Sequence, residues 1–364
     1  MGHFRRHRSG AIIRHPAKDT RPAVRYANLY AGGAFHGPDH RAGRLQQGPL
    51  ETEGMIMTQA ARPERKYVYN NMMTDSRRWD AYVPRDGDII ISTPPKCGTT
   101  WTQMICALLI FQKFPLDRKL SEYTLWLDMP LRPLGEILDI YDSQTHRRFI
   151  KTHTPLDGVP YFDNVTYLFV ARDPRDAFFS MGNHRKNTKP EMLEIMLRSA
   201  KERSLQMQMP ASDVRAAFRN WISASGIPDE GGMAEFNVLH HARTFWEFRH
   251  LPNIIMMHYS DMKADLEGQM RRLAAALNIS VEEGLWPQLA DAASFERMKE
   301  NADTLAPSGA HPDQWRDKAA FFNKGEHGQW QGVLGEEELA LYRQIMKERL
   351  EPDLARWLEH GWKG

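Results

Sequence analysis

The chain has 364 residues, a net charge of +2 and two cysteines, Cys97 and Cys106. This length allows one large hydrophobic core or two smaller ones, and the near-balanced charge gives no general reason to expect a nucleic acid or an acidic partner. Two cysteines are too few for a disulfide framework, which favours a reducing compartment. No apolar run reaches the ~18 residues that a membrane helix needs. We therefore expect a cytoplasmic protein without a membrane span.

Residues 1–62 differ in composition from the rest of the chain. They are rich in Arg, His, Gly and Pro and show no persistent apolar periodicity. Because such a segment buries too little apolar surface to offset its loss of entropy on ordering, we predict a flexible basic extension. The alternatives are a nucleic-acid-binding arm and a natural start at Met55 or Met57. Residues 63–364 are predicted to form one globular domain.

Four short apolar runs predict β-strands. They are residues 88–92, 148–151, 166–171 and 253–259. These runs are almost continuously apolar, which is typical of strands buried on both faces. Helical patterns follow the first, third and fourth runs, at residues 99–111, 174–185 and 260–277. The alternation predicts a single α/β domain with a central parallel sheet flanked by helices.

Further helical patterns carry many apolar residues. In residues 260–277, Ser260 or Asp261 is the expected N-cap. Residues 190–221 and 236–248 carry methionine and aromatic stripes. Stripes at this spacing usually face a core, although together they would also suit the wall of an apolar pocket.

Residues 93–101, TPPKCGTTW, connect the first predicted strand to the first predicted helix. Backbone N–H groups and the helix dipole make such a connection a concave site for an anion. Gly98 permits close approach, Thr99 and Thr100 add hydroxyl donors, and Lys96 adds a full charge. The alternative is an ordinary turn with Thr99 as the N-cap. We predict an anion site, because a lysine and paired threonines exceed what a turn requires.

Two familiar phosphate loops do not fit this stretch. A Walker A loop has the form GxxxxGK[ST], whereas here Lys96 precedes Gly98. A tyrosine-phosphatase loop needs an arginine six positions after its cysteine, and that position holds Gln103. Cys97 is therefore expected to be a small turn residue and not a nucleophile.

His153 lies just past the second predicted strand, where ligands bind in open α/β sheets. Its spacing from Lys151 puts both side chains on the same side of the strand. A lone histidine is more often structural than catalytic, and the neighbouring lysine leaves both roles open for His153.

Arg172 ends the third predicted strand, where a guanidinium can hold a phosphate with two parallel hydrogen bonds. Ser180 lies about two helical turns further on, and either faces the same site or is an ordinary helix serine. Asp173 and Asp176 are expected to cap the helix that starts between them.

Taken together, these stretches resemble the cytosolic-type sulfotransferases, which move a sulfuryl group from 3′-phosphoadenosine 5′-phosphosulfate (PAPS) to a hydroxyl or amine and release the bisphosphate PAP. TPPKCGTTW resembles the family's loop for the 5′-phosphosulfate, VARDPRDAFFS its 3′-phosphate site, and FIKTH the segment with the catalytic base. IIMMHYSDMKADL, ASFERMK and FFNKGEHGQW resemble two adenine-contacting segments and a loop that folds over the donor. The six motifs occur in the family's order, and flanking segments look like bacterial members proposed to sulfate glycolipids. The implied fold is related to that of the P-loop nucleotide kinases.

The resemblance also implies residue roles. Lys96 would stabilise the bridging and leaving oxygens, His153 would be the general base, and Lys151 would steady the sulfuryl oxygens. Ser180 would restrain Lys96 and contact the 3′-phosphate. The implied donor-binding residues are Lys96, Cys97, Gly98, Thr99, Thr100, Trp101, Arg172, Ser180, Tyr259, Ser294, Phe295, Met298, Phe321, Asn323, Lys324 and Gly325.

Three features depart from the family's pattern. Cys97 replaces the usual serine, with no expected effect because the backbone forms the cradle. Asn323 replaces an arginine that holds the 3′-phosphate, which implies weaker donor binding or help from Lys318. The dimer signature of animal relatives is absent near residues 331–338, so a monomer and a homodimer both stay open.

The predicted function is sulfuryl transfer from PAPS to a hydroxyl of an apolar or amphiphilic acceptor, such as a lipid, glycolipid, phenol or alcohol. No metal is expected, because no HExxH or CxxC pattern occurs. The alternatives are a kinase that uses ATP and Mg²⁺, and a nucleotide-binding or scaffold protein without turnover. Residues 115–145, 186–250 and 300–320 are expected to frame the acceptor pocket, because they are rich in Met, Trp, Phe and Leu.

Overall fold

The computed structural model describes residues 61–205, 211–228, 237–308, 311, 313–322 and 325–362. These residues belong to one compact unit, Gln59–Gly364. The extension predicted for residues 1–62 lies almost wholly outside the described residues and stays a prediction. Within the described part of the chain, every helix is too short or too polar to cross a membrane.

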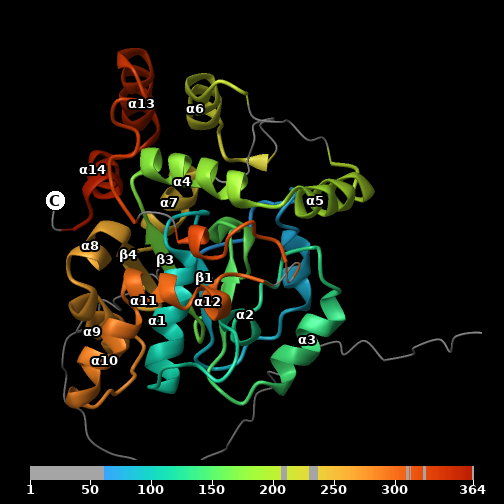
Figure 1. The fold of residues 1–364 in the computed structure, drawn as a ribbon, viewed down its shortest axis with the longest axis vertical. Coiled ribbons are helices and arrows are strands. Elements are labelled where there is room, and N and C mark those ends of the chain that lie inside the picture. The colour runs from blue at the N-terminus through green and yellow to red at the C-terminus, as the bar shows by residue number, and fades with distance from the viewer. Residues whose placement is uncertain are drawn as a thin grey trace, which may run out of the picture. The chain divides into compact units, whose positions relative to one another are not determined.

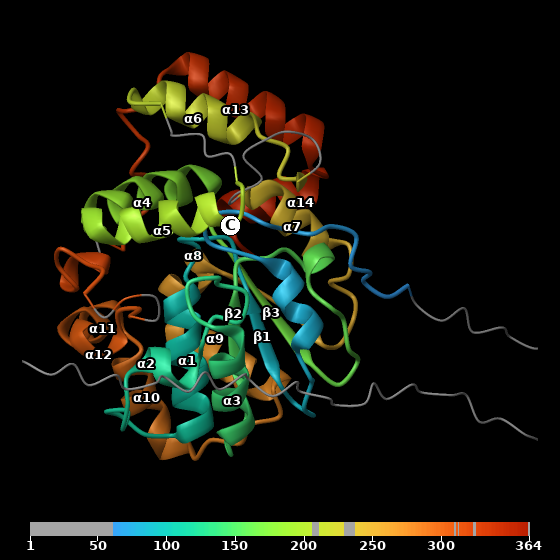
Figure 2. The same cartoon turned by 90° about the vertical axis from the view of Figure 1, so that its right-hand side faces the viewer.

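Four parallel strands form the centre of this unit, in the order β2-β1-β3-β4 (Figures 1 and 2). They are β1 Ile89–Ser92, β2 Phe149–Thr152, β3 Thr166–Ala171 and β4 Ile254–His258. Ile89 pairs with Phe149 on one side and Thr166 on the other, so the first residues of β1, β2 and β3 are in register. The predicted parallel sheet is confirmed, with strand ends within one residue of the predicted ones.

The sheet separates two hydrophobic cores. On β3, Tyr167 and Phe169 face one core, whereas Leu168 and Val170 face the other. This alternation explains the continuous apolar runs, because both faces of each strand are covered. The core that contains Leu168 is closed by α1 Thr99–Phe111, α9 Leu266–Ala276 and α10 Trp286–Ala292. The core that contains Tyr167 is closed by α7 Val238–Trp246, α13 Glu336–Arg349 and α14 Pro352–His360.

The remaining helices surround this central arrangement. They are α2 Leu120–Tyr123, α3 Leu134–Ser143, α4 Pro174–Asn187, α5 Pro190–Glu202, α6 Val214–Ser223, α8 Tyr259–Ala264, α11 Phe295–Glu300 and α12 Ala302–Leu305. Figure 2 shows α6 lying beside α13, although more than 100 residues separate them in the chain. The helix predicted at 99–111 is confirmed as α1, and the one predicted at 174–185 as α4.

Two predicted helices differ from the structure. The segment 190–221 forms α5 and α6, and α6 begins after Asp213, whose side chain accepts a hydrogen bond from the Ala216 amide. The segment 260–277 breaks at Asp265, which leaves helical geometry and caps α9 by accepting from the Gly268 amide at 3.0 Å. The predicted N-cap, Ser260 or Asp261, is wrong, because the His258 ring caps α8.

A buried ion pair joins the starts of β1 and β2. Asp88 precedes β1 and Arg148 precedes β2, and their side chains are 2% and 3% exposed. Arg148 Nε donates to Asp88 Oδ1 at 2.9 Å, and the Tyr82 hydroxyl donates to Asp88 Oδ2 at 2.6 Å. The pair therefore holds together the two strands whose far ends carry the lysine turn and His153.

We expect Arg148→Met to lower the free energy of unfolding by about 3–5 kcal/mol, because it leaves the Asp88 carboxylate buried without its cation. Urea unfolding followed by circular dichroism measures this. The matched control Arg356→Ala breaks the exposed pair with Asp353 and should change stability by less than about 1 kcal/mol. Equal, small losses in both variants would contradict the structural importance of the buried pair.

Candidate functional site

Each of the four strands is followed by a residue whose polar or aromatic side chain lines one cavity. The cavity has a volume of about 730 Å³. Lys96 follows β1, His153 follows β2, Arg172 follows β3 and Tyr259 follows β4, and all four side chains line it. Since the strands are parallel, their carboxyl ends meet at one edge of the sheet, which is where ligands bind in open α/β folds.

The turn before α1 leaves backbone donors free for a ligand. Lys96 and Gly98 both have positive φ, +68° and +109°. Among the described residues, no side chain caps α1, and the Thr99 hydroxyl instead hydrogen-bonds the Thr93 hydroxyl. Thr99 is therefore not the N-cap, and the first-turn N–H groups are left to face the cavity edge. An uncapped helix start with a lysine beside it suits a phosphate or sulfate group.

Lys96 is held by neutral groups. Its Nζ lies 4.5 Å from the centre of the Phe321 ring and 3.4 Å from His184 Nδ1. Burial, with the nearby charges of Arg172 and Lys151, lowers the Lys96 pKa to about 7. A bound anion would offset both causes and keep the amine charged.

His153 presents one defined nitrogen to the cavity. Its Nδ1 lies 2.6 Å from the Thr93 carbonyl oxygen. Because a carbonyl only accepts, Nδ1 carries the hydrogen and Nε2 keeps its lone pair. Burial, and then the charge of Lys151, hold the His153 pKa well below its usual range. The imidazole is thus neutral near pH 7, which is the state a proton acceptor needs.

A buried carboxylate fixes the backbone on both sides of His153. Asp128 Oδ2 accepts from the hydroxyls of Thr152 at 2.5 Å and Thr154 at 2.6 Å, and from Trp79 Nε1 at 3.0 Å. Asp128 itself is fully buried. Such a clamp leaves the residue between the two threonines little freedom.

Lys151 lies next to this clamp. Its Nζ is 4.3 Å from the centre of the Trp126 ring, and the same ring packs edge-on against His153 at 4.7 Å. Burial lowers the Lys151 pKa to about 8, opposed by the charge of Asp128. Lys151 and His153 therefore face the cavity together, as their spacing in the sequence predicts.

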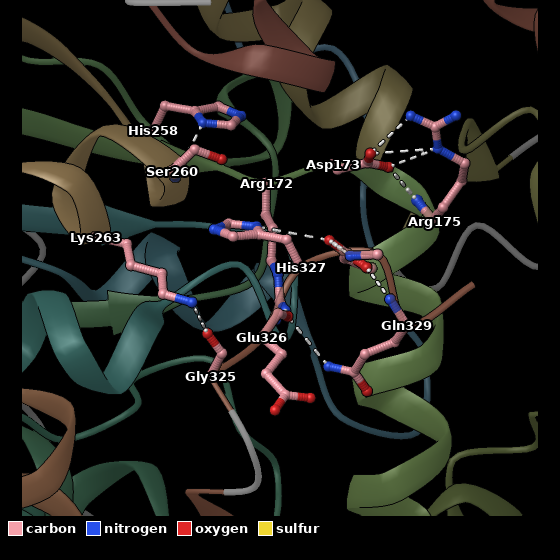
Figure 3. A network of polar contacts seen from close by, with 12 residues as sticks. Arg172, Asp173, Arg175, His258, Ser260, Lys263, Gly325, Glu326, His327 and Gln329 are labelled. Carbon is pink, nitrogen blue, oxygen red and sulfur yellow. Dashed lines mark hydrogen bonds and ion pairs between the residues drawn. The ribbon is translucent and has the colours of Figure 1, made fainter. Parts of the chain in front are cut away.

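Arg172 forms a second cationic point (Figure 3). Its guanidinium lies 4.4 Å from the centre of the Tyr259 ring, and it donates to the carbonyls of Lys96 at 3.3 Å and Glu326 at 3.0 Å. The residue is 4% exposed, and its buried Nε has no hydrogen-bond partner in the described structure. An unpaired buried donor of this kind fits an anionic ligand.

The segment 325–329, named the strap here, crosses this end of the cavity. Gly325 accepts from Lys263 Nζ at 2.7 Å, and the amides of Gly328 and Gln329 donate to Asp176 at 3.1 and 3.0 Å (Figure 3). Two aspartates were expected to cap α4. Only Asp173 does so, accepting from the Arg175 amide at 2.8 Å, whereas Asp176 anchors the strap. Asn323 and Lys324 lie outside the described residues.

Most of the other expected donor-binding residues also line the cavity. They are Gly98, Thr99, Thr100, Trp101, Ser180, Phe295, Met298, Phe321 and Gly325. Trp101 is fixed by its Nε1–H, which donates to the Ala293 carbonyl at 2.7 Å. Two expected residues do not line it. Cys97 is fully buried in the core, where burial raises its pKa to about 12, and Ser294 caps α11 by accepting from the Arg297 amide.

Much of the remaining cavity wall is apolar, and this part is called the apolar end here. It is made by Met72, Met73, Leu125, Met129, Leu131, Ile137, Met181, Met192, Met196, Leu197 and Leu305. The expected acceptor ranges 115–145 and 300–320 contribute, and so do residues 186–197. The described residues of 198–250 do not, because α6 and α7 pack into the core. Met72 and Met73 come from a segment that the sequence reasoning did not consider.

Three residues that line or support the site were not identified as such in the sequence analysis. His184 lies one turn beyond Ser180, and its i+4 spacing on the same helix was the available signal. Trp126 and Asp128 had no such signal, because an isolated bridge between Trp126 and Lys151 brings their segment to β2 only in the folded chain.

Comparisons with known proteins show which family this chain resembles. A family model described as the sulfotransferase domain matches residues 86–352. A glycolipid sulfotransferase of Mycobacterium bovis is 37% identical over 314 residues, which cover 82% of this chain and 96% of that protein. Luciferin sulfotransferase of Photinus pyralis is 27% identical and covers 73% of this chain and 72% of that protein.

Solved structures share the fold. Mouse sulfotransferase SULT7A1 complexed with PAP has a TM-score of 0.57 at 19% identity, covering 78% of this chain and 92% of that one. Retinol dehydratase in a complex with retinol and PAP has a TM-score of 0.56 at 22% identity, covering 76% of this chain and 84% of that one.

We expect affinity for PAP to fall as pH rises above about 7, because free Lys96 titrates near pH 7 and binds the anion only when protonated. Titration calorimetry between pH 6.5 and 9 measures this. In Lys96→Arg the fall should be shallower, since a guanidinium stays charged and only Lys151 still titrates. An affinity that is flat across this range in the unmodified protein would contradict the charged-lysine site.

Proposed function

Because this chain belongs to the sulfotransferase family, we propose that it transfers a sulfuryl group from PAPS to a hydroxyl of an apolar or amphiphilic acceptor. The observation that carries the proposal is the meeting of Lys96, His153 and Arg172 at one edge of the sheet, around a cavity whose other end is apolar. The name of the mycobacterial relative supports a glycolipid as one acceptor to test.

The donor would lie along the cationic end of the cavity. Its 5′-phosphosulfate fits the uncapped start of α1 beside Lys96, and its 3′-phosphate fits the unpaired Nε of Arg172. Trp101, Tyr259 and Phe295 supply aromatic surface for the adenine. The strap carbonyls that now accept from Arg172 and Lys263 would shift, because the phosphate competes for the same donors.

Bound PAPS supplies the sulfuryl group and a phosphate leaving group. His153 Nε2 takes the proton of the acceptor hydroxyl as the oxygen–sulfur bond forms. Lys96 and the first-turn amides of α1 stabilise the negative charge that develops on the departing oxygen. Lys151 faces the same space and holds the sulfuryl oxygens. The negative charge of the donor offsets Lys96 and Lys151, so it raises the His153 pKa toward a value suited to a base.

The acceptor would enter from the methionine-lined end and direct its hydroxyl at His153. Methionine side chains are flexible and polarisable, so this wall suits a lipid chain or an irregular apolar body. The proposal includes a reducing, cytoplasmic setting, which the two buried free cysteines support. It leaves both a monomer and a homodimer open.

The full chain, incubated with ³⁵S-labelled PAPS and a panel of glycolipids, alkyl glycosides, phenols and sterols, tests the proposal. We expect labelled product and PAP with at least one apolar acceptor. Titration with ATP and Mg²⁺ distinguishes the proposed sulfotransferase from the kinase alternative, because a sulfotransferase should bind ATP more weakly than PAPS. PAPS binding without turnover on any acceptor class would favour a non-catalytic protein, and no binding would overturn the proposal.

We expect His153→Ala to lower turnover at least ~10²-fold, because it removes the proton acceptor. PAP affinity should stay within a few-fold, since Lys96 and Arg172 are unchanged. Steady-state kinetics and calorimetry on the same preparation measure both. Turnover close to that of the unmodified protein would remove His153 from the mechanism.

We expect Arg172→Ala to weaken PAP binding about tenfold or more, because charged hydrogen bonds to a phosphate are lost. Arg172→Lys should be intermediate, since it keeps the charge without the planar fork. The control Arg343→Ala removes an exposed arginine that pairs with Glu336 on α13 and should bind PAP normally. Normal affinity in Arg172→Ala with an intact fold would refute the 3′-phosphate site.

A further inference from the structure

His184 is a second imidazole in the cavity, and neither the fold nor the proposed chemistry assigns it a role. It lies on α4 one turn beyond Ser180, and both side chains line the cavity. The family resemblance implies that Ser180 restrains Lys96. In the structure, however, the Lys96 amine contacts His184, with Nζ 3.4 Å from Nδ1.

The chemistry of the two groups fixes the direction of this contact. A lysine ammonium donates hydrogen bonds and accepts none. His184 Nδ1 is therefore the acceptor, and the ring hydrogen sits on Nε2. Burial, followed by the charge of Lys96, holds the His184 pKa well below its usual range. The imidazole stays neutral whenever the lysine is charged, so the contact is a hydrogen bond and not a repulsion.

Packing holds the imidazole in place. The His184 ring lies 4.8 Å from the Trp315 ring and 5.8 Å from the Phe321 ring, both edge-on. Phe321 also lies beneath the Lys96 amine, and Trp315 is tied by its Nε1–H to the Pro307 carbonyl at 2.7 Å. The lysine turn, α4 and the segment 315–321 therefore meet at His184.

We propose that His184 is a positioning residue for Lys96. It accepts a hydrogen bond from the lysine amine and so holds that cation beside the uncapped start of α1, where the leaving oxygen develops its charge. This rests on the proposed function, since Lys96 matters to turnover only if a sulfuryl group is transferred. His184 acts through Lys96 and takes no proton from the acceptor.

Other titratable groups surround the contact. Lys96 is also near Arg172, Lys151 and the Cys97 thiol, and His184 is also near Lys151, His153 and Arg185. All of these except the thiol and His153 are cations. Loss of the His184 acceptor would therefore leave the Lys96 charge opposed by like charges, and the Lys96 pKa should fall further below about 7.

The test compares three variants of the full chain. His184→Leu and His184→Asn have nearly the same shape, but only asparagine offers an oxygen near the position of Nδ1. His184→Phe keeps a ring against Trp315 and Phe321 and removes the acceptor, so it serves in place of His184→Leu if the leucine variant fails to fold. Thermal unfolding checks the fold, and two unrelated acceptors are used for the kinetics.

We expect His184→Leu and His184→Phe to lower kcat about tenfold with both acceptors, the low end for a lost hydrogen bond to a charged group. As pH is raised, the activity of these variants should also begin to fall at a lower pH than that of the unmodified protein, because protonated Lys96 is the active form and its pKa has fallen. Calorimetry in two buffers should show a larger proton uptake on PAP binding at pH 7. His184→Asn should recover most of kcat and the pH profile.

Three results would overturn the proposal. A change confined to the KM of one acceptor would make His184 a wall residue of the acceptor pocket. Equal losses in the asparagine and leucine variants, with unchanged pH profiles, would show that the imidazole acts only through packing. Unchanged proton uptake on PAP binding would show that His184 does not influence Lys96. Absence of turnover in the unmodified protein would instead count against the proposed function, while the proton uptake measurement still tests the contact itself.

Discussion

The structure depends on holding several cations together at one buried edge of a parallel sheet. Lys96, Lys151 and Arg172 share the cavity. Burial lowers the pKa of Lys151 to about 8, and burial with the nearby charges of Arg172 and Lys151 lowers the pKa of Lys96 to about 7. This arrangement is unfavourable on its own. It persists because two packed cores and the buried Asp88–Arg148 pair fix the strands that carry it. A bound polyanion would reduce the repulsion between these like charges, which supports the proposed donor site.

The partners of these cations are neutral. Arg172 donates to two backbone carbonyls, Lys151 lies over the Trp126 ring, and Lys96 rests between His184 and Phe321. Arg175, by contrast, pairs with the carboxylate of Asp173. Carbonyls, rings and imidazoles restrain a cation without cancelling its charge, so the full charge stays available to a ligand. His184 can contact Lys96, and His153 can lie beside Lys151, only because their buried rings remain neutral next to lysines.

The two ends of the cavity differ in charge and in rigidity. The cationic end has fixed backbone geometry, with two positive-φ residues before α1 and a strap anchored on Asp176. The apolar end is lined by flexible methionines from several segments. A rigid, charged end suits a donor of constant shape, whereas an adaptable end suits acceptors that vary. The Asp128 clamp fixes the backbone around His153, which the proposed reaction requires to reach the acceptor hydroxyl.

The sequence alone determined the positions of the strands and their parallel arrangement. It also determined the lysine turn and the residues that follow each strand, because all of these are local patterns of burial and spacing. It failed where a side chain had competing partners. Asp176 anchors the strap and Asp265 breaks a helix, although both also look like ordinary helix residues. Only the tertiary structure decided that Asp128 clamps His153, that Met72 reaches the cavity and that Lys96 meets His184. Contacts between segments far apart in the chain follow from how the two cores close on the sheet, and no local pattern records that packing.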